Sequence, residues 1–175
     1  MSSLVMHRYA VRLTRDRLER EILRFKDLGF TIHHPTTGQV RYGGDTVETA
    51  GEEYMLDPEE WMARLVEGTI SNFDLWLTDS EWKDLHCGVS HSESTTRWSY
   101  YIDGFSAEER TRVKAALVAV ALSEPAGTRA IVLDTWAPEG EIAAFVERRV
   151  GEPPESVVFA MVRVEPPTTD GQPGA

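Results

Sequence analysis

The order in which apolar patterns change along the chain is the feature that most limits its possible folds. Apolar residues that alternate with a period of two predict strands, and those that recur with a period near 3.6 predict helices. The patterns predict a strand, a helix and a hairpin, then a helix, three strands, and two helices that alternate with two strands. Because helices and hairpins mix without strict alternation, we predict an α+β fold with a mixed, mainly antiparallel sheet flanked by about four helices.

The boundaries of these elements follow from the apolar runs and from the turn residues between them. The predicted strands cover residues 4–13, 30–34, 39–42, 70–77, 85–91, 98–103, 130–133 and 157–164. The predicted helices cover residues 14–28, 57–68 and 106–122, and a fourth begins at Pro138. In the first strand, Arg8 and Arg12 lie on one face, and the opposite face carries Val5, His7, Tyr9, Val11 and Leu13.

Two helix starts have strong local signals. In the first, Asp57 is placed to cap the helix, Pro58 occupies the first helical position, and Glu60 can reach back to the cap. In the second, Ser106 and Glu109 have the spacing of a capping box. We therefore expect both helices to begin at these residues.

The length and composition of the chain fit one domain. A chain of 175 residues is typical of a single domain, which we expect over residues 1–165, with a weak seam near 43–51 and a disordered tail at 166–175. Cys87 is the only cysteine, so no intrachain disulfide can form. The start of the chain lacks the pattern of a signal peptide. The longest apolar run, residues 115–122, is far shorter than the ~20 residues that cross a bilayer. We therefore expect a cytoplasmic protein.

Acidic charge is concentrated in the middle of the chain. Residues 1–43 carry eight Lys/Arg against four Asp/Glu, whereas residues 44–109 carry three against sixteen and residues 110–175 carry seven against nine. The formal net charge is −11. A net negative protein repels phosphate backbones and anionic lipids, so we expect no binding to nucleic acids or membranes. A basic protein is the partner that this charge favours, and nothing in the sequence selects an oligomeric state.

Residues 45–60, the acidic segment, hold seven acids and no base. Such a segment can bind a cationic partner, with aromatic side chains as anchors. The residues that we select for this surface are Asp45, Glu48, Glu52, Glu53, Tyr54, Asp57, Glu59 and Trp61. The competing interpretation is a solvated loop and helix start, or an internal contact with the basic helix at residues 14–28.

In size, acidity and general layout, the chain resembles the small acidic immunity-type proteins of bacterial toxin systems. The resemblance implies a non-enzymatic, protein-binding antitoxin whose carboxylates enter the phosphate-binding cleft of a cationic toxin. It rests on architecture and on the acidic segment, without a diagnostic motif. It therefore assigns no role to any single residue.

A second hypothesis places a small-ligand or enzymatic site on the predicted sheet. Asp74 and Trp76 alternate with leucines on one strand, so they share the face opposite the core. Histidine titrates near neutral pH and could act there as acid or base. The residues of this alternative pocket are Asp74, Trp76, His86, His91, Trp98, Tyr101 and Asp103. The competing interpretation is that a helix covers this face and the tryptophans belong to the core.

No residue pattern predicts a catalytic motif, a metal site or a cofactor. Cys87 and His91 share one face of a predicted strand but lie ~13 Å apart, too far to share a metal or a proton. The sequence around Ser90 lacks the second glycine of a hydrolase nucleophile elbow, and a strand rather than a helix should follow it. We therefore favour a binding protein over an enzyme.

Overall fold

We describe a computed structural model of the chain over residues 5–79, 83–123, 127–133 and 161–163. The three described helices are α1 (Arg15–Asp27), α2 (Pro58–Glu67) and α3 (Ala107–Leu122). The described strands are β1 (Val5–Val11), β2 (Phe30–Thr31), β3 (Val40–Gly43), β4 (Glu53–Leu56), β5 (Asn72–Leu77), β6 (Asp84–His91), β7 (Thr95–Tyr101), β8 (Thr128–Leu133) and β9 (Met161–Arg163).

Seven of these strands form one sheet, in the order β2-β5-β6-β7-β1-β8-β9, and all its described pairings are antiparallel. Strands β3 and β4 form a separate two-stranded hairpin. The predicted α+β class is confirmed. The described residues contain three helices rather than about four, and the helix predicted from Pro138 and the tail at 166–175 lie outside them.

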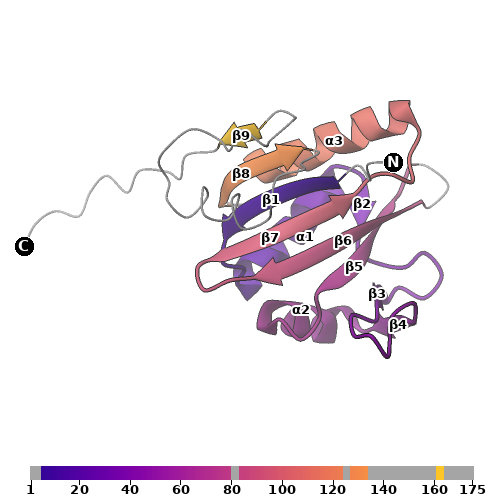
Figure 1. Ribbon diagram of the computed structural model, residues 1–175. Helices are drawn as coiled ribbons and strands as arrows, with labels where there is room; N and C mark the ends of the chain where they lie inside the picture. Colours follow the sequence, from indigo (N-terminus) through magenta and orange to yellow (C-terminus); the bar gives the residue numbers. More distant parts are fainter. Residues whose placement is uncertain (1–4, 80–82, 124–126, 134–160, 164–175) are drawn as a thin grey trace, which may run out of the picture.

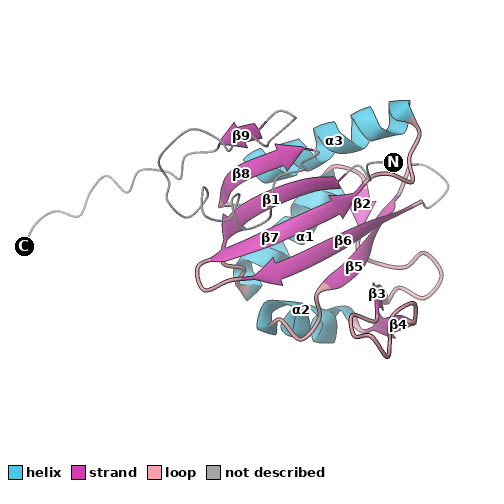
Figure 2. Ribbon diagram, viewed as in Figure 1, coloured by secondary structure: helices cyan, strands magenta, loops and turns pink. Residues whose placement is uncertain are grey.

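The described helices pack on one face of the sheet, with α1 and α3 behind it in the view of Figure 1. Phe25 of α1 contacts Trp98 edge-on at 6.5 Å between ring centroids, and Trp61 of α2 contacts Phe73 at 4.9 Å. Val113 and Leu117 of α3 belong to the same buried cluster. No helix among the described residues covers the opposite face, which we call the open face (Figure 2).

An ion pair lies inside this core. Arg8 of β1 is 1% exposed, pairs with the carboxylate of Glu21 on α1, and lies 4.7 Å from the ring centroid of Trp98. Burial of a charge is costly unless it is paired, and the carboxylate and the aromatic face compensate part of this cost. The Nε and Nη1 atoms of Arg8 have no hydrogen-bond partner among the described residues. The residues of β1 alternate between the two faces, as predicted. Arg8, however, was predicted on the face opposite the apolar residues, and it lies on the core side between the buried Met6 and Ala10.

The predicted helix starts are present. Asp57 caps α2 by accepting a hydrogen bond from the backbone N–H of Glu59 at 2.9 Å. Ser106 and Glu109 form a complete capping box at the start of α3. Glu60, which we expected to reach back to the cap, instead lies 3.9 Å from Arg64 one turn later. Within the part of the chain that the structure describes, no helix is long and apolar enough to span a membrane.

Candidate functional site

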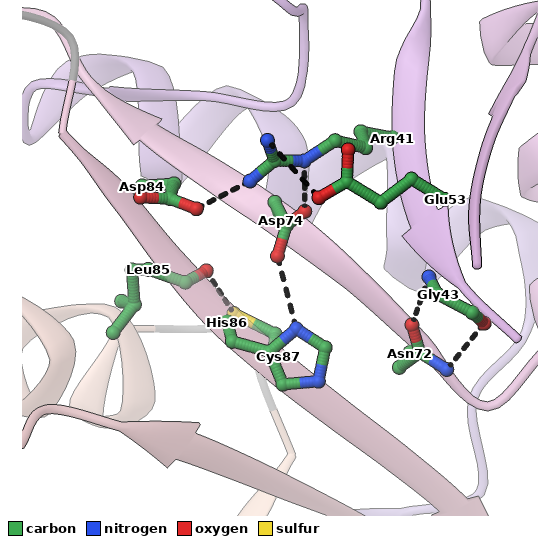
Figure 3. Close-up of polar contacts among 9 residues, drawn as sticks. All are labelled: Arg41, Gly43, Glu53, Asn72, Asp74, Asp84, Leu85, His86 and Cys87. Carbon is green, nitrogen blue, oxygen red and sulfur yellow. Dashed lines mark hydrogen bonds and ion pairs between the residues drawn. The ribbon is translucent and has the colours of Figure 1, made fainter. Parts of the chain in front are cut away.

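The acidic hairpin, formed by β3, β4 and the connecting residues 44–52, is attached to β5 through Arg41. The Nε atom of Arg41 donates to Asp74 Oδ2 at 2.5 Å, and its guanidinium also pairs with Asp84 (Figure 3). Glu53 lies 3.8 Å from the same guanidinium. The guanidinium also stacks on Trp76, 4.6 Å from the ring centroid. One cation is thus shared by three carboxylates.

A second attachment uses only neutral groups. The side-chain amide of Asn72 on β5 accepts from Gly43 N at 2.6 Å and donates to Gly43 O at 3.0 Å (Figure 3). The side-chain amide therefore makes the pair of hydrogen bonds that a backbone amide group of a neighbouring strand would otherwise make. The hairpin is held against the sheet without becoming one of its strands.

Asp74 connects this attachment to a histidine on the open face. Its Oδ1 atom lies 2.9 Å from His86 Nδ1, and the His86 side chain is 49% exposed. Burial alone would raise the pKa of Asp74, but hydrogen bonds from His86 and Arg41 outweigh it and lower that pKa. Because an ionised carboxylate only accepts hydrogen bonds, His86 Nδ1 carries the proton and Nε2 keeps its lone pair in the neutral ring.

Tyr101 extends the same row across the sheet. It pairs in register with His86, and the two ring centroids are 5.6 Å apart. A Cβ atom added to Gly88 would lie 3.7 Å from Tyr101 Cε2, so the tyrosine ring lies against this glycine. Asp74, His86 and Tyr101 therefore form a row of side chains that leads from the acidic hairpin onto the open face.

A further polar pair lies beside this row. His7 Nδ1 is 2.9 Å from Ser99 Oγ, and Ser99 is opposite Gly88 in the strand register. Burial, together with the positive charge of Arg97, lowers the pKa of His7 to about 4. His7 is therefore neutral near pH 7 and acts as a hydrogen-bonding partner of the serine.

The connection between β3 and β4 is ordered by its own side chains. The hydroxyls of Thr46 and Thr49 lie 2.8 Å apart, and Asp45 accepts from Ser71 Oγ at 2.8 Å. Val47, which lies between the two threonines in the sequence, is 99% exposed. Glu48 is exposed beside it. The connection therefore presents acids and the large aliphatic side chain of Val47 to solvent.

The structure corrects one predicted anchor of the acidic segment. Trp61 is fully buried, because its position in α2 faces the sheet and packs on Phe73. Tyr54 stacks on Tyr42 at 5.3 Å between centroids and donates its hydroxyl hydrogen bond to Glu52. Trp61 therefore serves the core, and Tyr54 is held on the surface of the acidic hairpin.

The basic helix contacts the acidic segment at a single described ion pair. Arg15 of α1 pairs with Glu59 at 2.5 Å and with Glu19 on its own helix at 2.7 Å. Asp57 is occupied as the helix cap. The predicted internal docking is thus limited to the start of α2.

The alternative pocket separates into two groups on opposite faces. Asp74, His86 and Tyr101 meet on the open face, and Trp76 shares that face beneath Arg41. Asp103 is exposed in the turn that follows β7.

Trp98 and His91 lie on the core face, contrary to the prediction. Trp98 is buried against Phe25. His91 contacts the backbone carbonyl of Leu65 at 2.8 Å and Thr96 Oγ1 at 2.9 Å. The reason is strand parity: His91 is five residues from His86, and Trp98 is three from Tyr101, so each pair is divided between the two faces.

Sequence reasoning missed Arg41, which joins the two predicted sites. Its partners Asp74 and Asp84 are 33 and 43 residues away along the chain. A single arginine in a short strand is ordinarily assigned to solvent, so no local pattern marked it. The signal that could have marked it is the tertiary placement of the hairpin, which the sequence alone does not provide.

No group of three or more His, Cys, Asp or Glu side chains among the described residues could hold a metal ion. A small pocket of about 50 Å³ lies on the helix side of the sheet and is lined by residues including Phe30, Leu77 and Val113. It does not adjoin His86 or Tyr101. No protein-family model matches the chain, and no curated protein or solved structure matches it either.

Proposed function

We propose that this chain is an acidic protein-binding module that neutralises a cationic protein, in the manner of an immunity or antitoxin protein. The observation that carries this proposal is the small amount of internal charge compensation in the acidic segment. Its described ion pairs are Glu53 with Arg41, Glu59 with Arg15, and Glu60 with Arg64. Asp45, Glu48, Glu52 and Asp57 make no ion pair with another described residue.

The attachments of the acidic hairpin also support the proposal. Asn72 and Arg41 hold it on β5, and the hydroxyls of Thr46 and Thr49 order its tip. A preorganised surface loses less conformational freedom on binding than a flexible loop does. Exposed carboxylates on a rigid support can steer a basic partner during association and occupy a site that otherwise binds phosphate groups.

Co-purification with the product of the neighbouring reading frame tests this function. The expected partner is a basic protein, and its dissociation constant should rise as salt is added, because counterions screen the opposing charges. The variant Glu48→Gln/Glu52→Gln/Glu53→Gln should weaken binding by about tenfold or more. Asp16→Asn on α1, outside the acidic segment, is the control and should leave the affinity unchanged. Salt-insensitive binding that the triple variant also retains would contradict the proposal.

A second candidate function, proton transfer to a small ligand, is favoured by the contact between Asp74 and His86. The imidazole donates from Nδ1 to Asp74 Oδ1, with 2.9 Å between the two atoms. This leaves Nε2 as a base on the open face. A panel of metabolites can be screened by thermal shift with the wild type and His86→Gln. A compound that stabilises only the wild type would support this candidate, and a panel with no such compound would count against it.

A further inference from the structure

Tyr101 is an exposed aromatic side chain on the open face, in the same row as His86 and Asp74. Among the described residues, the exposed large hydrophobic side chains are four aliphatic ones and Tyr101, which is 39% exposed. Tyrosine at the centre of an interface contributes more binding energy than most residue types. Because Trp61 is buried and Tyr54 stacks on Tyr42, the anchor of a binding surface is best sought at Tyr101.

Direct contacts join Tyr101 to the acidic hairpin. Glu53 pairs with Arg41, which donates to Asp74. Asp74 accepts from His86, whose ring packs beside Tyr101. Tyr101 is therefore part of a surface that continues from the hairpin onto the open face.

The side chains around Tyr101 restrain it and leave it in an acidic setting. Gly88 provides a flat contact for the ring, and the buried Ser99 lies opposite Gly88. Asp103 just after β7 is exposed. Asp84 shares the single guanidinium of Arg41 with two other carboxylates, so this group keeps a net negative charge. Arg97 is the cation nearest in sequence on the same face, and it is opposite Tyr9 in the strand register. The charge near the end of β7 thus favours a cation over the tyrosine.

We propose that Tyr101 is the anchor of the interface and that it receives an arginine side chain of the partner protein. The proposal rests on the proposed function, because it names the partner group that the acidic surface would bind. A planar guanidinium stacks on an aromatic ring while its N–H groups donate to carboxylates, a combination that a lysine ammonium does not provide. Within this chain, Arg41 over Trp76 and Arg8 over Trp98 show the same pairing of guanidinium, ring and carboxylate.

The test is a titration of the full chain with a hexa-arginine peptide at low salt. NMR or calorimetry measures the dissociation constant. Tyr101→Ala should weaken binding by about tenfold, whereas Tyr101→Phe, which keeps the ring, should bind nearly as well as the wild type. Leu23→Ala removes a side chain that is 60% exposed on α1, and it serves as the matched control with unchanged affinity. Circular dichroism on each variant shows whether the fold is retained.

The outcomes separate this inference from the function on which it rests. If the carboxylate variant Glu48→Gln/Glu52→Gln/Glu53→Gln weakens binding but Tyr101→Ala does not, the acidic module stands and the anchor is wrong. If the wild type does not bind the arginine peptide, the inference about Tyr101 is wrong, and the proposed function is judged separately by the titration with the neighbouring product. If a hexa-lysine peptide binds as tightly as hexa-arginine, stacking on Tyr101 is overturned. Loss with Tyr101→Ala and retention with Tyr101→Phe support the inference.

Discussion

Arg41 Nε lies 2.5 Å from Asp74 Oδ2, and this contact joins the acidic hairpin to the large sheet. The acidic segment and the histidine-bearing sheet face were predicted as alternative sites. The contact joins side chains of both predicted sites in one network, because the buried Asp74 is also bonded to His86.

Removing Arg41 should destabilise the protein. In Arg41→Ala, the buried Asp74 loses its closest cation and the hairpin loses its contact with Trp76, so the free energy of unfolding should fall by about 2–3 kcal/mol. The matched control is Arg15→Ala, which breaks two exposed ion pairs and should change the free energy of unfolding much less. Urea denaturation measures both. Equal losses for the two variants would show that Arg41 is only a surface charge.

The buried ion pair should be replaceable only as a pair. Glu21→Leu leaves Arg8 charged in the core and should lower the free energy of unfolding by about 3–5 kcal/mol. The double variant Arg8→Met/Glu21→Leu should recover most of that loss, since neither charge then needs compensation. A double-mutant cycle by chemical denaturation gives the coupling energy. Additive losses would contradict the packing that we describe.

His7 should make stability depend on pH in mildly acidic solution. Its pKa is lowered from 6.5 to about 4, so as pH falls through this range the unfolded chain takes up a proton that the folded protein does not. Stability should therefore fall between pH 6.5 and about 4. The pKa of His91 is also lowered, chiefly by burial, and acts in the same direction. The urea midpoint of His7→Gln should depend less on pH than that of the wild type.

Glu109 should stabilise the start of α3 in its ionised form. A hydrogen bond from Lys83, followed by those with Ser106, lowers the pKa of Glu109 from 4.5 to about 2. This stabilisation is present above pH 4.5 and should be lost as pH falls toward about 2. Carboxyl NMR titration measures the pKa directly, and Lys83→Met should shift it upward. A Glu109 titration near 4.5 in the wild type would show that these contacts do not persist.

Gly44 should be required for the shape of the hairpin tip. A Cβ atom at this position would lie 2.1 Å from the backbone oxygen of Thr49, so Gly44→Ala must displace the backbone. We expect a loss of about 1–3 kcal/mol in the free energy of unfolding and weaker binding of a basic partner, although the charge is unchanged. Gly104→Ala is the control, because nothing lies within 4 Å of its added Cβ. A thermal melt distinguishes the two variants.

The sequence predicted local features well because their causes are local. The capping box at Ser106 and the cap at Asp57 depend on residues within one turn, and both are present. Strand alternation also placed Asp74 and Trp76 opposite the core leucines, although both are buried and in contact with Arg41. The assignment failed at Trp61, where a charged helix start suggested exposure although one helical face packs on the sheet.

Features that depend on distant residues were not predictable in this way. Arg8 in a strand indicates solvent by residue type, and only Glu21 and Trp98, brought close by the fold, explain its burial. Arg41 holds the hairpin on the sheet because it contacts carboxylates that are distant in the sequence. Which histidine would meet Asp74 required the strand register between β5 and β6, and the register places His86 there.

The decisive experiment measures the dissociation constant for the product of the neighbouring reading frame over a series of salt concentrations. Binding should weaken steadily as salt rises, because counterions screen the opposing charges. In Glu48→Gln/Glu52→Gln/Glu53→Gln, binding should be weaker at low salt and depend less on salt, because fewer opposing charges remain to be screened. A neighbouring product that does not bind, or the same salt dependence in wild type and variant, would contradict the claim that this surface recognises a cationic protein.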